Sequence, residues 1–266
     1  MFYWIYDYPS SLIGALFALV FVGVTWLGIF AFRPIVRSWI HGERSANDMV
    51  GFAFSSFSVL YGLLLGLLAV AAYQNFSSVT DLVTKEASSV AALYRDTQGY
   101  PQPIRGDLQA KLREYTRFVI EESWPEQRKG NIPKGGTERV TAFFDDFIAF
   151  KPQEKGEEII HAEAFREFNN FIELRRERLA NVNTGIPPVL WWVVGIGALL
   201  TIGLVWLLDM EIHVHLILGG ILSLFLGIVI FLIAAMDNPF RGDVSVGPDA
   251  FQVVYDSLMK PTAGPE

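Results

Sequence analysis

Four charged residues stand just beyond long apolar stretches and are the first candidates for a functional site. Glu86 and Arg95 follow a stretch that begins near Met49, and Asp237 and Arg241 follow one that ends at Met236. If both stretches end at the same membrane interface, these four groups come near one another. They would then form a structural ion-pair cluster or the vestibule of an ion pathway, and the residues alone leave both readings open.

Small residues recur every three or four positions within the first of these stretches, which places them on one stripe of a helix. They are Gly51, Ser55, Ser58, Gly62 and Gly66. Such a stripe lets helices approach closely in lipid, where packing drives association. It either packs inside one subunit, or its Ser55, Ser58, Gly62 and Gly66 line a pore on the axis of an oligomer. A shorter stripe (Gly220, Ser223 and Gly227) favours packing.

The chain offers little for catalysis, metal binding or redox chemistry. It contains no Cys, and its closest histidines, His213 and His215, have no third ligand nearby, so a metal site is not expected. There is no Gly-rich phosphate loop and no nucleophile elbow. We therefore predict neither enzymatic activity nor a cofactor. The net charge of −7 argues against a nucleic-acid partner, because phosphate binding needs a basic patch.

The elements that must position these residues are membrane-spanning helices. Of the 266 residues, 52% are hydrophobic and 18% are charged, and the apolar residues gather in four long blocks. The blocks predict spans at about 11–32, 50–73, 188–208 and 213–236, the first ended by Arg33-Pro34. None of them contains Asp, Glu, Lys or Arg within its apolar core, which argues against a pump or coupled transporter but not against a channel.

The second span organises the rest of the chain, because its helical pattern continues beyond the membrane. No charged residue occurs between Asp48 and Asp81, and no Pro or Gly breaks the polar half that follows. Val83, Val90 and Leu93 then extend one apolar helical face. We expect one uninterrupted helix of roughly 70 Å, half in lipid and half in water, ended by the Pro-rich turn at 99–103.

The remaining water-exposed segments read as further helices. Amphipathic patterns predict helices at about 107–124, 137–150 and 157–182, and Pro248 fits the first position of a last one. The fold class is therefore all-α: an integral membrane protein with four transmembrane helices and a helical extramembrane bundle between spans two and three. The expected domains are 1–73 (spans one and two), 74–186 (the bundle), 187–236 (spans three and four) and 237–266 (a C-terminal motif and amphipathic helix).

A set of short motifs resembles a bestrophin-like family of membrane proteins, and the similarity extends from about Asn47 to Leu258. The motifs are Leu63-Leu64-Leu65-Gly66, Tyr73-Gln74-Asn75, Lys85-Glu86-Ala87, Leu93-Tyr94-Arg95, Glu122-Ser123-Trp124-Pro125 and Asp237-Asn238-Pro239-Phe240-Arg241-Gly242. Through its remote similarity to bestrophins, the resemblance implies a homo-oligomer, a pentamer, that conducts anions such as chloride along an axis lined by the second span. It also implies a cytoplasmic bundle at the cell membrane. The acidic calcium-binding run of bestrophins has no counterpart, because Asp237 and Asp243 are too sparse.

Two functions follow as hypotheses. The first is an oligomeric anion channel in the lipid bilayer, with the second span lining the pore. The alternative is a non-conducting scaffold or sensor whose bundle binds a protein partner. Charges near the spans leave the membrane orientation open, because Arg33, Arg37 and Arg44 lie on one side and Lys85, Arg175, Arg176, Arg178 and Arg241 on the other.

Overall fold

The computed structural model describes residues 3–40 and 44–260, and these are built from helices without a strand. Four helices are long and apolar enough to cross a membrane, as predicted. The longest, α2, runs from Arg44 to Asp96 as one helix, so the expected continuity past Tyr73 is confirmed. The described residues fall into two compact units. We call them the membrane unit (residues up to 75, 185–237 and 242–244) and the bundle unit (76–184, 238–241 and 245–260).

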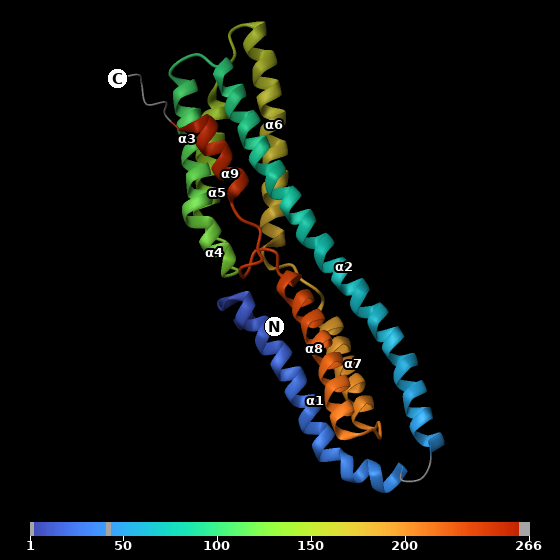
Figure 1. The fold of residues 1–266 in the computed structure, drawn as a ribbon. Helices are drawn as coiled ribbons and strands as arrows, with labels where there is room; N and C mark the ends of the chain where they lie inside the picture. Colours follow the sequence, from blue (N-terminus) through green and yellow to red (C-terminus); the bar gives the residue numbers. More distant parts are fainter. Residues whose placement is uncertain (1–2, 41–43, 261–266) are drawn as a thin grey trace. The chain divides into compact units, whose positions relative to one another are not determined.

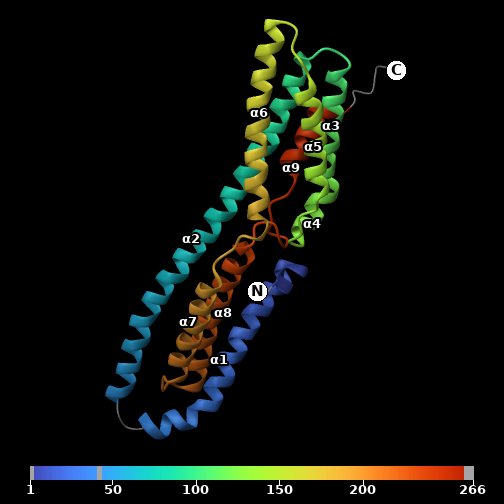
Figure 2. The same cartoon turned by 180° about the vertical axis from the view of Figure 1, so that it is seen from behind.

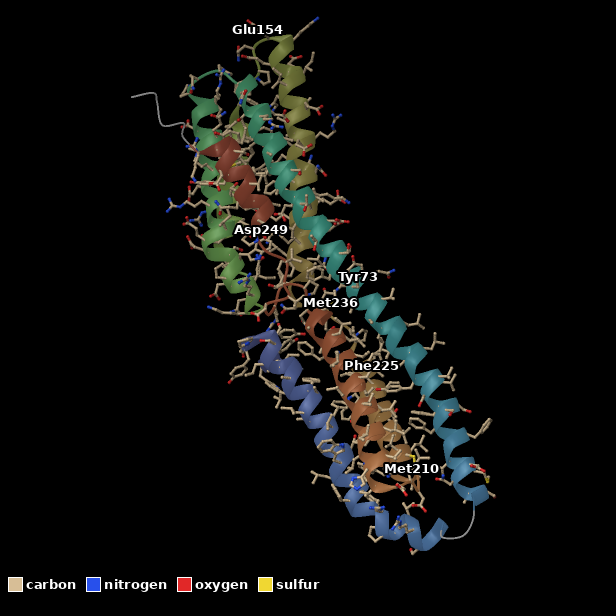
Figure 3. All side chains as sticks on the ribbon, in the orientation of Figure 1. Tyr73, Glu154, Met210, Phe225, Met236 and Asp249 are labelled. Carbon is tan, nitrogen blue, oxygen red and sulfur yellow. The ribbon has the colours of Figure 1, made fainter. Side chains whose placement is uncertain are left out.

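The membrane unit contains α1 (Ser10–Ile40), the apolar half of α2, α7 (Pro188–Trp206) and α8 (Ile212–Asp237). Helices α7 and α8 lie between α1 and α2 in both views of the chain (Figures 1 and 2). One face of α2 shares an apolar core with α7 and α8, and its buried residues there are Tyr61, Leu65, Leu68 and Ala72. Many apolar side chains of this unit are exposed, among them Phe225 on α8, whose position is labelled in Figure 3. Such a surface suits lipid, so this is a membrane protein with four spans.

The prediction that Arg33-Pro34 ends the first span was wrong, because α1 continues through Pro34 to Ile40. Proline removes one helical hydrogen bond, and spanning helices tolerate this loss when neighbouring packing compensates. Phe32 stacks on Trp206 before the proline, and Val36 is buried after it. Packing on both sides therefore holds the helix together. Residues 33–40, which the sequence placed beyond the first span, are therefore helical.

The bundle unit packs helices around one apolar core. It contains the polar half of α2, α3 (Ile104–Phe118), α4 (Trp124–Arg128), α5 (Gly135–Ala149), α6 (Lys155–Ala180) and α9 (Asp249–Val254). The core includes Val83, Val90 and Leu93 of α2, whose spacing predicted this face. Phe251 of α9 is also buried there, so the C-terminal helix faces protein. The helix begins at Asp249, so Pro248 occupies the N-cap position and not the first helical position that the sequence predicted.

Candidate functional site

The small-residue stripe of α2 faces open space in the membrane unit. A Cβ atom added at Gly51, Gly62 or Gly66 would meet no described atom within 4 Å. Ser55 is exposed, and its hydroxyl donates to the carbonyl of Gly51 at 2.8 Å. The hydroxyl of Ser58 is enclosed and has no hydrogen-bond partner among the described residues. Among the described residues, nothing therefore packs on the stripe at Gly51, Gly62 and Gly66, whereas Ser58 is partly covered by the protein.

The opposite situation holds on the neighbouring face of α2, where contact with α7 is tight. The Tyr61 hydroxyl donates to the carbonyl of Val194 at 2.7 Å. A Cβ atom at Gly197 would come within 2.2 Å of the Tyr61 ring, so this glycine is required for the close approach. Residues 61 and 62 differ by about 100° around a helix. The contact with α7 thus leaves the stripe beside it uncovered.

The shorter stripe of α8 is packed, as expected. A Cβ atom at Gly227 would lie 3.1 Å from the carbonyl oxygen of Phe17, and one at Gly220 would lie 3.1 Å from Trp26 Nε1. Helices α1 and α8 therefore approach closely along this line. The stripes of α2 and α8 are similar in sequence but differ in the structure. Among the described residues, the glycines of α8 have close neighbours, and those of the α2 stripe have none.

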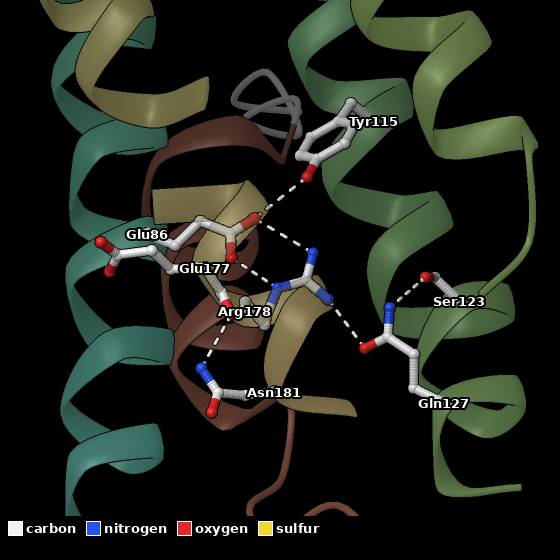
Figure 4. A network of polar contacts seen from close by, with 7 residues as sticks. All are labelled: Glu86, Tyr115, Ser123, Gln127, Glu177, Arg178 and Asn181. Carbon is white, nitrogen blue, oxygen red and sulfur yellow. Dashed lines mark hydrogen bonds and ion pairs between the residues drawn. The ribbon is translucent and has the colours of Figure 1, made fainter. Parts of the chain in front are cut away.

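Glu86 lies at the centre of a polar network inside the bundle unit (Figure 4). Its carboxylate forms an ion pair with Arg178 of α6, and the two side chains are 0% and 1% exposed. Arg178 Nη2 donates to Glu86 Oε1 at 3.0 Å, and Arg178 Nε donates to the other oxygen. The Tyr115 hydroxyl also donates to Glu86 Oε1, at 3.1 Å. Both carboxylate oxygens are thus satisfied, which a buried charge requires.

The rest of the network satisfies the guanidinium of Arg178. Its Nη1 donates to Gln127 Oε1 at 2.7 Å, and Gln127 Nε2 donates to Ser123 Oγ at 2.7 Å. The guanidinium carbon lies 5.4 Å from the Trp124 ring centroid and 5.7 Å from that of Phe251. Burial, with the charge of Glu86, raises the pKa of Tyr115, so its hydroxyl keeps its proton and remains a donor. The network joins α2, α3, α4 and α6.

The structure places the four predicted charges in different surroundings. Glu86 pairs with Arg178 and not with Arg95, which is exposed on α2. Arg95 lies nine positions after Glu86 along that helix, a rise of roughly 13 Å. Arg241 Nη2 donates to Asn183 Oδ1 at 3.3 Å in the bundle unit.

Asp237 belongs to the membrane unit, where it joins the end of α8 to the start of α7. Its Oδ1 accepts a hydrogen bond from the backbone N–H of Ile186, and its Oδ2 accepts one from Trp191 Nε1 at 3.2 Å. These bonds fix the approach of the chain to α7, because they hold a backbone group and a side chain on either side of Pro187 and Pro188.

Sequence reasoning missed Arg178, which it treated as a charge flanking the membrane. One signal could have found it. Glu86 lies three residues after Val83 and four before Val90, on the apolar face of α2. A carboxylate on a buried face needs a cationic partner, and the basic residues of the helix at 157–182 were the candidates.

The described residues contain no group of three or more His, Asp or Glu side chains that could hold a metal ion. His215 is buried and hydrogen-bonded through Nε2 to the carbonyl of Val205 at 2.9 Å. It closes the α7–α8 hairpin. Tyr61, Ser223 and Thr25 show the same pattern of polar groups satisfied by backbone carbonyls within the spans.

The chain was compared with known families and solved structures. The model of a Bestrophin-like domain matches residues 16–251. No curated protein matches the chain. Three crystal structures of a bacterial bestrophin homologue from Klebsiella pneumoniae share the fold. Two are of variants, with 13% and 12% identity and TM-scores of 0.63 and 0.65. The third has 15% identity and a TM-score of 0.61. The alignments cover 92–93% of this chain and 97–99% of theirs.

Proposed function

Because the chain belongs to the bestrophin-like family, we propose that it forms a homo-oligomeric ion channel with α2 lining the pore. The permeant ion is an anion, chloride in the first instance, and the assembly is a pentamer. Both points rest on the resemblance to bestrophins. One helix from one subunit cannot enclose a path, so the function requires several copies around an axis.

The observation that carries this proposal is the open stripe of α2. Gly62 and Gly66 have free space where a side chain would stand, and Ser55 is exposed beside them. Small residues keep a central path wide, and a serine hydroxyl that turns away from its helix carbonyl can donate a hydrogen bond to a passing anion. The stripe of α8 differs from the stripe of α2 in this respect. Its small residues serve packing, and side chains of α1 occupy the space beside them.

The charged residues take separate roles in this proposal. Arg95, exposed on the polar half of α2, contributes positive charge to the vestibule, and Arg241 adds to it near Asn183. Glu86 acts through Arg178 to hold α2 in the bundle unit. Asp237 positions the start of α7 through Ile186 and Trp191. The channel resides in the cell membrane with the bundle in the cytoplasm.

Ion flux from purified protein in liposomes tests the channel. We expect a chloride flux that Gly62→Leu and Gly66→Leu reduce strongly, because each places a large side chain on the stripe. Gly203→Leu is the matched control, since Gly203 also has no described atom within 4 Å of an added Cβ but lies on α7. Separate gradients of chloride and sodium identify the permeant ion.

Two outcomes would overturn the proposal. Well-folded oligomers that conduct no ion would exclude a channel. A monomer or dimer, measured by mass in detergent and in lipid nanodiscs, would exclude an axial pore built from α2 and favour a scaffold or sensor.

A further inference from the structure

The membrane unit contains an apolar groove between α1 and α7. Its volume is about 350 Å³. The lining residues are all apolar and come from these two helices: Val20, Phe21, Val24, Trp192, Gly195, Ile196, Ala198, Leu199 and Ile202. Ligand sites for polar molecules carry a few placed polar groups, and this groove has none. Its occupant must therefore be a hydrocarbon.

The groove is about as long as one leaflet of a bilayer is thick. Ile202 lies ten positions after Trp192 along α7, a rise of about 15 Å, and half of a hydrocarbon core of about 30 Å is the same length. Trp192 lies within the first turns of α7, and its side chain is 71% exposed. Tryptophan favours the membrane–water boundary. The groove thus begins about one turn after the start of α7 and extends past the middle of that span.

The groove is also continuous with the lipid-facing surface of the spans. Leu19 and Leu27 of α1 are 71% exposed, and the lining residues Ile196 and Leu199 of α7 are exposed as well. Helices α7 and α8 separate α1 from α2 in Figures 1 and 2. Gly195 leaves open space where a side chain would stand.

We propose that this groove binds one acyl chain of a membrane phospholipid from the leaflet that contains Trp192. The acyl chain enters beside Trp192, passes over Gly195 and ends near Ile202 and Val24. Contact is entirely apolar, so the site selects for the chain and not for the headgroup. The inference does not depend on ion conduction.

Photo-crosslinking in liposomes tests the site. A phospholipid carrying a diazirine in the middle of one chain should label peptides that contain residues 20–24 and 192–202 above the other lipid-facing segments. Gly195→Phe should abolish this enrichment, because the new ring occupies the groove. Gly203→Phe should retain it, since Gly203 has equal space on α7 but does not line the groove. Val24→Phe fills the groove from α1 and should repeat the loss.

Three results would overturn the proposal. If the phospholipid labels Gly195→Phe and Val24→Phe as strongly as the wild type, the acyl chain lies elsewhere. Crosslinks between two copies through Trp192 or Leu199 would show that a second subunit fills the groove. Labelling by a diazirine fatty acid, without labelling by the phospholipid, would assign the site to a free fatty acid.

Discussion

Arg178 and Glu86 form a two-point ion pair in the interior of the bundle unit, with both side chains withdrawn from solvent. The pair joins α6 to α2 across 92 residues of sequence. A buried pair adds little net stability relative to apolar side chains of similar size, but losing one partner leaves an uncompensated charge. The pair therefore fixes the register of α2 against α6 more than it adds to the total stability.

Arg178→Leu should destabilise the protein by about 3–5 kcal/mol, because it leaves the Glu86 carboxylate buried without a cation. Urea unfolding in detergent, followed by tryptophan fluorescence, measures this loss. The double variant Glu86→Leu with Arg178→Leu should recover most of it, because no charge then remains buried. Arg176→Leu is the control and should change the free energy of unfolding by less than about 0.5 kcal/mol, since Arg176 is exposed. Equal effects at 176 and 178 would contradict the importance of the ion pair.

The sequence was sufficient for the spans and for the continuous α2 because those features depend on local pattern. Apolar length identified four spanning helices, and the spacing of Val83, Val90 and Leu93 identified the buried face of α2. The error at Pro34 has a different origin. Local propensity favours a helix end there, and the packing of Phe32 and Val36 overrides it. Such packing is invisible until the neighbouring helices are placed.

The candidate site was less predictable for the same reason. The stripes of α2 and α8 have similar composition, and only the folded chain shows that Phe17 covers Gly227 while Gly62 is left open. The partner of Glu86 lies far away in sequence, and several arginines at 157–182 were equally plausible. The spacing of residues in the sequence thus predicts which face of a helix is buried. The residues that contact this face depend on the tertiary structure.

Alanine substitutions at two glycines should separate a packed helix face from an open one. Gly197→Ala should cost about 1–3 kcal/mol, because its Cβ meets the Tyr61 ring at 2.2 Å. Gly66→Ala should instead stabilise the detergent-solubilised protein by about 0.5–1 kcal/mol, since alanine favours helix and the position is open. Thermal unfolding of the purified protein measures both. Destabilisation by Gly66→Ala would show that the stripe is packed within one chain.

Asp96 should make stability depend on pH at the end of α2. Burial, followed by the charges of Glu163 and Glu167, raises the pKa of its carboxyl above the ordinary value of 3.8. Because the folded-state pKa is higher than the unfolded one, the folded state binds the proton more tightly. This contribution is present below the unfolded pKa and is lost as the pH rises through the folded pKa. Asp96→Asn should therefore be more stable than the wild type at pH 7.

Unfolding temperatures of both proteins between pH 3.5 and pH 7.5 test this expectation. The advantage of Asp96→Asn should shrink as the pH falls, since the wild-type carboxyl then becomes neutral as well. Asp107→Asn, at an exposed carboxyl early in α3, serves as the comparison. A constant difference across the range would mean that the asparagine acts by a route other than removal of charge.

Gly130 should be the glycine of the bundle unit that tolerates alanine least, because two constraints meet there. Its φ of +85° lies in the region that side chains disfavour, and an added Cβ would come within 1.8 Å of Arg241 Nη2. Gly130→Ala should therefore cost more than about 1 kcal/mol. It should also displace Arg241 from Asn183, whose Nδ2 donates to the Gly130 carbonyl at 3.1 Å.

Gly156→Ala is the control. An added Cβ at Gly156, in the first turn of α6, meets no described atom within 4 Å, so this substitution should be neutral or stabilising. Thermal unfolding of the two variants distinguishes them, and a neutral Gly130→Ala would mean that the turn can adopt another backbone conformation.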